Sequence, residues 1–248
     1  RILCDLGAEV IKIEGVRRVD TIRALFIADN DPQGDYWNRS GYYLSRNVGK
    51  RSLTLDFNND SGVALFKRLV PLADVVAESF TPRVMRNLGL DYESLRQLKP
   101  DLIMISLSGY GQNGPWSDYG AYGTGLEAAS GICSLTGYRD GPPYRTGISF
   151  TDPYSGLVAA GAVLTALYYR RRTGRGQYID LSEHEAAIPL MGQALLDYQM
   201  NDRSPVRLGN RSPVAAPQGC YRCQGDDQWL VISVGNDAQW AAFCQAVG

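Results

Sequence analysis

Short apolar runs that alternate with helical patterns constrain the fold of this chain more than any other feature. Strand-like runs lie at residues 9–14, 52–57, 73–79, 102–108, 177–182 and 229–235. Helical patterns separate most of them, and they include residues 61–73, 92–99, the apolar segment after residue 152, and 183–201. This alternation is typical of an α/β fold with a parallel-rich sheet. Because several strands are apolar throughout, we expect helices to cover both faces of that sheet.

Proline content predicts where one domain gives way to another. Residues 202–219 carry three prolines and little apolar periodicity, which indicates a linker. We therefore predict a large Rossmann-like domain at 1–201 and the truncated beginning of a smaller second domain at 220–248. The first residues, RILCDLG, resemble the last turn of a helix that ends at Gly7. We expect an N-terminal strand of the large domain to be missing.

Charge and cysteine content narrow the classes of function. The chain has 25 basic and 26 acidic residues, so composition indicates no general attraction to nucleic acid. Its longest apolar run, residues 157–169, is well short of the ~20 residues that span a membrane. Five scattered cysteines suit a reducing compartment, and we expect a cytoplasmic protein. Cys220 and Cys223 have the spacing of zinc ligands but lack a second pair, so we predict no metal.

Asp152 is the strongest candidate for a catalytic side chain. Asp152 followed by Pro153 predicts an N-cap and the first position of a helix. Arg170 to Arg172 and then Gly174 predict the end of that helix. We expect the helix to be buried and its positive end to keep Asp152 ionised, as a nucleophilic carboxylate requires. An aspartate in this position is also often only a helix cap.

A glycine-rich segment follows the strand at 102–108. Gly109, Gly111 and Gly114 match the GxGxxG pattern of dinucleotide-binding proteins. Pro115 and Trp116 come next, however, where that pattern needs an opening helix. We therefore interpret residues 109–114 as a loop whose glycines let backbone amides approach a substrate, and we predict no resident cofactor.

Several positions suit a phosphate-bearing ligand. Lys50 and Arg51 stand at the start of a strand, and Arg23 lies in a turn after another strand. Each is either a solvated cation or a phosphate contact. Ser79 and Phe80 close the strand at 73–79, where the carboxyl ends of parallel strands form ligand crevices. Phe80 offers either an apolar face for a base or a core contact.

A series of segments in this order resembles one family, the class III CoA-transferases. The segments are DLGAEVIKIE (5–14), NVGKRSLTLD (47–56), LVPLADVVAESF (69–80), LGLDYESLRQLKPDLIMISLSGYGQNGP (88–115) and residues 152–177. The resemblance covers essentially the whole chain. It implies a Rossmann-like large domain, a small domain and an interlocked homodimer.

The resemblance also implies a reaction and the residues that perform it. CoA would move from an acyl-CoA donor to a carboxylic acid acceptor through a mixed anhydride and an aspartyl-CoA thioester. Asp152 would be the catalytic residue, acyl-CoA would be a substrate rather than a permanent cofactor, and no metal would take part. The implied CoA-binding residues are Arg23, Asn47, Lys50, Arg51, Ser79 and Phe80. The implied loop beside the thioester contains Gly109, Tyr110, Gly111 and Gln112.

Three alternatives remain open from the sequence. The α-methylacyl-CoA racemases of the same superfamily need a histidine, but the corresponding position holds Tyr122, and His184 lies in a different segment. A non-catalytic CoA-binding or nucleotide-binding module would keep the fold without the chemistry. An oxidoreductase is disfavoured because Pro115 directly follows the glycine pattern.

Overall fold

The structure of the protein, a computed structural model, describes residues 1–15, 17 and 19–248. Its contacts divide the chain into two compact units. Unit 1 comprises Arg1–Ala121 and Asp152–Ala186, and unit 2 comprises Tyr122–Thr151 and Ala187–Gly248. The predicted division into a large domain, a linker and a small domain uses other boundaries and stays a prediction.

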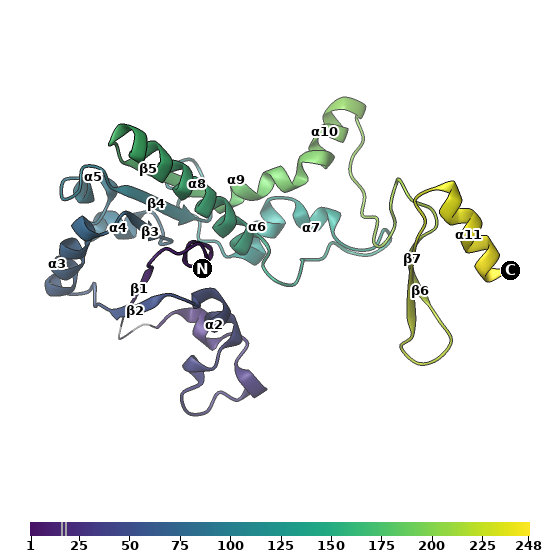
Figure 1. The fold of residues 1–248 in the computed structure, drawn as a ribbon, viewed down its shortest axis with the longest axis horizontal. Helices are drawn as coiled ribbons and strands as arrows, with labels where there is room; N and C mark the ends of the chain where they lie inside the picture. Colours follow the sequence, from purple (N-terminus) through teal and green to yellow (C-terminus); the bar gives the residue numbers. More distant parts are fainter. Residues whose placement is uncertain (16, 18) are drawn as a thin grey trace. The chain divides into compact units, whose positions relative to one another are not determined.

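Unit 1 contains two parallel sheets (Figure 1). In the first, β1 (Ile11–Glu14) pairs with β2 (Arg51–Thr54). In the second, β4 (Ile103–Ser108) lies between β3 (Val75–Glu78) and β5 (Gln177–Ser182). These five strands match five of the predicted runs, so the prediction of a parallel-rich α/β fold is confirmed.

The central strand β4 explains why helices cover both faces of its sheet. Met104 and Ile105 are each 1% exposed, and adjacent residues of a strand point to opposite faces. Met104 packs in a cluster with Leu90, Leu95 and other residues that precede β4 in sequence. Ile105 packs on the other side, in a cluster that includes Val163 of the long helix α8. The apolar character of β4 therefore fixes a three-layer arrangement, with α8 lying along the sheet (Figure 1).

The helices of unit 1 that precede α8 are short. They are α1 (Ile2–Asp5), η1 (Thr21–Ala24), η2 (Ala28–Asn30), η3 (Tyr36–Asn38), α2 (Gly41–Asn47), α3 (Asp60–Leu69), η4 (Val70–Leu72), α4 (Arg83–Asn87) and α5 (Tyr92–Leu95). The predicted end of α1 is confirmed, because Gly7 has a φ of +96° just after the helix. None of the helices in the described part of the chain is long and apolar enough to cross a membrane.

Helix α8 (Thr151–Thr173) differs from its prediction at its start and in its burial. It begins at Thr151, so Asp152 lies in the first turn rather than at the N-cap. Pro153 still costs no hydrogen bond, since the first N–H groups of a helix have no partner within it. One face is buried, along Ser155, Ala159 and Val163, but Leu157 on the other face is 56% exposed. The prediction that this helix is buried is therefore wrong, because one of its faces is exposed in the single chain.

The end of α8 is joined to the sheet as well as capped. Gly174 has a φ of +71°, and its N–H donates to the carbonyl of Arg170 at 2.8 Å. The Arg170 guanidinium contacts the carboxylate of Asp74 at 2.5 Å and that of Asp101 at 3.7 Å. These two aspartates stand just before β3 and β4. Arg170 thus links the last turn of α8 to the two strands, and its interaction with the helix dipole stays a prediction.

Unit 2 contains helices and an antiparallel hairpin. Its elements are α6 (Gly123–Ala129), α7 (Ile132–Leu135), η5 (Ile188–Met191), α10 (Gly192–Asn201), β6 (Gln218–Arg222), β7 (Trp229–Ser233) and α11 (Asp237–Val247). Strand β6 was not predicted, and it begins inside the predicted linker. Its sequence, QGCYR, shows no apolar pattern, and its side chains are mostly exposed. The segment is a strand because its backbone pairs with β7.

Candidate active site

Two carboxyl groups lie together where β5 ends and α8 begins. Asp152 is an exposed residue of the first turn of α8. Glu183 is the first residue of α9 (Glu183–Ala187), directly after β5. A hydrogen bond joins the two side chains. A pair of this kind must hold a proton, since two adjacent ionised carboxylates repel each other.

The proton of this pair lies mainly on Glu183. Burial and the nearby charge of Asp152 raise the pKa of Glu183 to about 8. At neutral pH Glu183 is therefore mostly protonated and donates a hydrogen bond, and the negative charge of the pair lies on Asp152. Sequence reasoning missed Glu183. The available signal was an acidic residue directly after a parallel strand, at the edge where ligand sites form.

The glycine-rich loop at 109–114 lies against the same end of β5. The N–H of His184 donates to the carbonyl of Gly109 at 2.9 Å. The carboxylate of Asp180 accepts from the N–H of Gln112 at 2.9 Å and from the side chain of Asn113 at 3.0 Å. Gly111 has a φ of +84°, which a residue with a side chain rarely adopts. The loop therefore lies beside the carboxyl pair, but its Gln112 amide already has an acceptor.

His184, the chain's sole histidine, packs between aromatic rings of this loop region. Its ring centre lies 5.4 Å from that of Tyr110 and 5.5 Å from that of Trp116. Its Nε2 atom is buried without a hydrogen-bond partner among the described residues. Tyr122, which occupies the position of the racemase histidine, precedes α6 and is 81% exposed.

A buried carboxylate of unit 2 orders the turn that leads to α8. Glu127 on α6 is 0% exposed and accepts hydrogen bonds from the N–H and hydroxyl of Thr146 and from the N–H of Phe150. Burial alone would raise the pKa of Glu127, but these hydrogen bonds outweigh it and hold the pKa below its usual range. Thr151, the first residue of α8, donates its hydroxyl to the carbonyl of Gly123 at 2.9 Å. Both contacts fix the backbone immediately before Asp152.

Arg23 is already fully engaged within the chain. Its guanidinium donates to both carboxylate oxygens of Glu14, at 2.7 and 3.0 Å, and to the hydroxyl of Tyr43 at 2.6 Å. It also donates to the carbonyl of Trp37 and to the side chain of Asn38. The hydrogen bond from Arg23 is the largest effect that lowers the pKa of Glu14 to about 2. In this structure Arg23 fastens the end of β1 to η1 and η3 rather than presenting a free cation.

Asn47, Lys50 and Arg51, which the resemblance assigns to CoA, lie close together in the structure. They line a cavity of about 250 Å³ between α2 and β2, together with Lys12 and Tyr43. The Lys50 ammonium donates to the Asn47 side chain at 2.9 Å. Burial, followed by the charge of Lys12, lowers the pKa of Lys50. Two cations that repel each other at a cavity favour an anion there, and sequence reasoning missed Lys12.

Ser79 and Phe80 lie apart from that cavity in the topology. They follow β3, in the sheet that does not contain β1 and β2. Phe80 is 44% exposed, and its N–H donates to the carboxylate of Glu78 at 2.8 Å. The six residues that the resemblance assigns to CoA therefore fall into two groups. Asn47, Lys50 and Arg51 line the cavity, and Arg23 lies beside it because its partner Tyr43 is a lining residue, whereas Ser79 and Phe80 lie at the end of β3.

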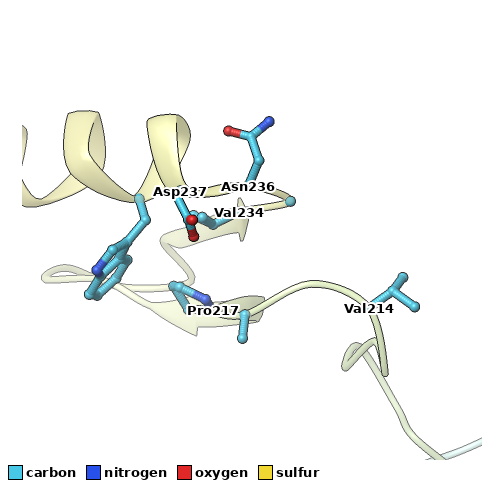
Figure 2. Close-up of a pocket in the computed structure, with 8 residues that line it drawn as sticks. Val214, Pro217, Val234, Asn236 and Asp237 are labelled. Carbon is cyan, nitrogen blue, oxygen red and sulfur yellow. The ribbon is translucent and has the colours of Figure 1, made fainter.

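A second cavity, of about 460 Å³, lies within unit 2 (Figure 2). Val214, Pro217, Val234 and Asp237 are among the residues that line it, and none of the predicted site residues does. Cys220 and Cys223 are exposed free thiols. Among the described residues, no group of three or more His, Cys, Asp or Glu side chains is placed to hold a metal ion.

The chain belongs to CoA-transferase family III, whose family model matches residues 1–248. It is 36% identical over its whole length to a succinate–glutarate CoA-transferase of Agrobacterium fabrum and 39% identical to an acetyl-CoA:oxalate CoA-transferase of Acetobacter aceti. It covers 62% and 61% of these two relatives. The resemblance to class III CoA-transferases is thereby confirmed, for a chain that spans about three fifths of the length of the curated relatives it matches.

Solved structures agree with the fold. A CaiB/BaiF family protein from Brucella suis superposes with a TM-score of 0.86 at 35% identity, over 99% of this chain and 64% of that one. A hypothetical protein from Mycobacterium tuberculosis superposes with a TM-score of 0.80 at 30% identity, over 100% of this chain and 63% of that one.

Proposed function

We propose that the chain carries the catalytic aspartate and part of the CoA site of an enzyme that transfers CoA from an acyl-CoA to a carboxylic acid. The observation that carries this proposal is Asp152, an exposed carboxylate in the first turn of α8 whose partner Glu183 holds the proton of the pair. Family membership supports it. Several relatives are named for dicarboxylic acids or their CoA thioesters, so we propose an acid of that class as acceptor.

The proposed reaction needs one nucleophilic carboxylate. An oxygen of Asp152 attacks the thioester carbonyl, the carbon–sulfur bond breaks, and CoA leaves as the thiolate. The thiolate then attacks the aspartyl carbonyl of the mixed anhydride, which releases the donor acid and leaves an aspartyl-CoA thioester. The acceptor carboxylate attacks that thioester, the carbon–sulfur bond breaks, and CoA leaves again as the thiolate, which gives an anhydride of Asp152 with the acceptor. The thiolate then attacks the acceptor carbonyl of this anhydride, which forms the acceptor acyl-CoA and regenerates the Asp152 carboxylate. Covalent catalysis of this kind divides one difficult exchange into easier steps without redox change.

Covalent trapping tests the proposed reaction. The protein is incubated with acyl-CoA, quenched with hydroxylamine or with borohydride, digested and analysed by mass spectrometry. We expect a hydroxamate or a reduced side chain on the peptide that contains Asp152, because both reagents attack activated acyl groups. A protein that turns over acyl-CoA but gives only unmodified Asp152 would contradict the proposal.

Lys50 gives a separate prediction about CoA binding. Replacing Lys50 with alanine should raise the KM for acyl-CoA about 10- to 100-fold, since a hydrogen bond to a charged group is worth roughly 1.5–3 kcal/mol. The effect on KM should exceed the effect on kcat, and calorimetry with free CoA should show the same loss of affinity. Lys67→Ala, on α3, is the matched control. Equal KM values for the two variants would show that the cavity at Lys50 does not bind CoA.

Assembly and location complete the proposal. We propose a homodimer, as the resemblance implies. The exposed apolar side chains of α8 support this proposal, because they suit a helix that packs against another protein surface. Leu157, Leu164 and Tyr168 are 56%, 44% and 63% exposed in the single chain. We also propose the cytoplasmic location that the cysteine pattern predicts.

A further inference from the structure

We propose that Glu183 is a positioning residue for Asp152, and that it acts as a neutral hydrogen-bond donor throughout the transfer reaction. This inference rests on the proposed role of Asp152 as the nucleophile. It adds a second carboxyl group to the site, with a defined protonation state and a defined effect on two steps of the reaction.

The backbone around Glu183 is well held, as a positioning role requires. Ser182, the preceding residue, pairs with Ser108 in the ladder between β4 and β5. The Ser182 hydroxyl accepts from the N–H of Glu185 at 3.2 Å, which fastens the start of α9. The hydroxyl of Ser155 on α8 donates to the carbonyl of Glu183 at 3.5 Å. Contacts from strand, helix and turn therefore fix the origin of the Glu183 side chain relative to the first turns of α8.

The two carboxyl groups have different surroundings, and this difference decides which one keeps the proton. Asp152 is exposed, whereas Glu183 is partly buried. Burial penalises the charged form of an acid, so the more buried member of the pair stays neutral. A neutral carboxyl group can donate a hydrogen bond, and an ionised one cannot. Glu183 thus holds one oxygen of Asp152 in place, and in the proposed reaction the other oxygen attacks the thioester.

The same hydrogen bond has a second effect after Asp152 has been acylated. The negative charge of Asp152 is lost in the anhydride, and its remaining oxygen becomes a carbonyl oxygen. When the CoA thiolate attacks that carbonyl, negative charge develops on the oxygen that Glu183 can contact. A positioned donor stabilises such an oxyanion. The proton stays on Glu183 throughout, so no additional acid or base is needed.

The charged and titratable groups around Glu183 are few among the described residues. Asp152 on α8 is the group whose charge acts on it. Its own helix α9 carries His184 and Glu185, and the first turn of α8 also carries Tyr154. Tyr110 of the glycine-rich loop packs against the His184 ring. When Glu183 ionises, the resulting repulsion therefore acts first on Asp152.

Two substitutions at Glu183 test the inference through the pH profile of kcat. In the unsubstituted protein kcat should fall above about pH 8, where Glu183 loses its proton. Glu183→Gln keeps a donor that cannot ionise, so kcat should be about threefold lower at pH 7, and the alkaline fall should disappear. Glu183→Leu removes the donor and should lower kcat about 100-fold, the usual effect of losing one such donor. Glu185→Gln, on the same helix, should leave the profile unchanged.

Each outcome separates this inference from the proposed function. An alkaline fall that persists in Glu183→Gln, or Glu183→Leu with full activity, overturns the positioning role. The trapping experiment at Asp152, repeated on these variants, reports on the nucleophile independently. If Asp152 of the unsubstituted protein is trapped while the Glu183 variants behave normally, the proposed function stands and only this inference fails. The near-isosteric Glu183→Gln decides the question even if Glu183→Leu does not fold.

Discussion

Asp152→Asn should lower the rate of CoA transfer by about 10⁴-fold or more, since the loss of a covalent nucleophile has effects of this order. Asparagine keeps the size and shape of the side chain but has no carboxylate oxygen to attack a thioester. The measurement is kcat with an acyl-CoA donor and a panel of dicarboxylic acid acceptors. In the same variant, the affinity for acyl-CoA should change little, because the residues proposed to bind CoA lie in η1, at the end of α2, at the start of β2 and just after β3.

The controls for Asp152 separate chemistry from folding. Asp140→Asn changes an exposed aspartate of unit 2 and should retain full activity. Circular dichroism should show the same helix content for both variants and the unsubstituted protein. Turnover of Asp152→Asn above about 1% of the unsubstituted rate would exclude Asp152 as an obligatory nucleophile, given the size of the expected loss.

Glu127→Ala should lower the free energy of unfolding by about 3 kcal/mol, since it leaves buried donors without an acceptor, each costing roughly 1–3 kcal/mol. The affected donors are the N–H and hydroxyl of Thr146 and the N–H of Phe150. Thermal unfolding should show a fall in Tm of roughly 6–12 °C for a chain of this size. Glu93→Ala removes an exposed glutamate that pairs with Arg96 and should change Tm far less.

The stability that Glu127 contributes should also depend on pH. The hydrogen bonds hold its pKa in the folded protein below the ordinary value of about 4.3. The unfolded chain therefore binds the proton first as the pH falls. The contribution is fully present above the ordinary pKa and is lost as the pH falls through the lower, folded value. Urea unfolding across this range should show a steeper loss for the unsubstituted protein than for Glu127→Gln, and parallel curves would contradict this.

The sequence predicted the secondary structure well where local signals were strong. Five strands of unit 1 lie within or beside the apolar runs, and Gly7 and Gly174 end helices as predicted. Strand β6 was missed because its pairing with β7, rather than its composition, makes it a strand. The exposed face of α8 was missed because the sequence is apolar on all sides of the helix. Such a sequence does not show which side packs against the rest of the chain.

The candidate site was predictable only in part, for a related reason. Asn47, Lys50 and Arg51 are neighbours in sequence and remain neighbours in space. Contacts between residues that are distant in the sequence could not be predicted in this way. The bond between Asp152 and Glu183 joins residues far apart in the sequence, and the pairing of Arg23 with Glu14 depends on how the chain returns to β1. Spacing in the sequence indicates which side chains could bind or react with a ligand. Tertiary contacts decide which of these side chains already have hydrogen-bond partners within the chain.

The contact between Asp180 and the loop at 109–114 has a consequence for altering substrate range. A carboxylate on β5 and the conformation of Gly111 hold the path of the loop, so its backbone does not rest on the packing of Tyr110 against Trp116 and His184 alone. Libraries that vary this side chain should therefore reshape the space for the acyl group while the scaffold keeps its course. Directed evolution toward new acids would then begin from a stable framework.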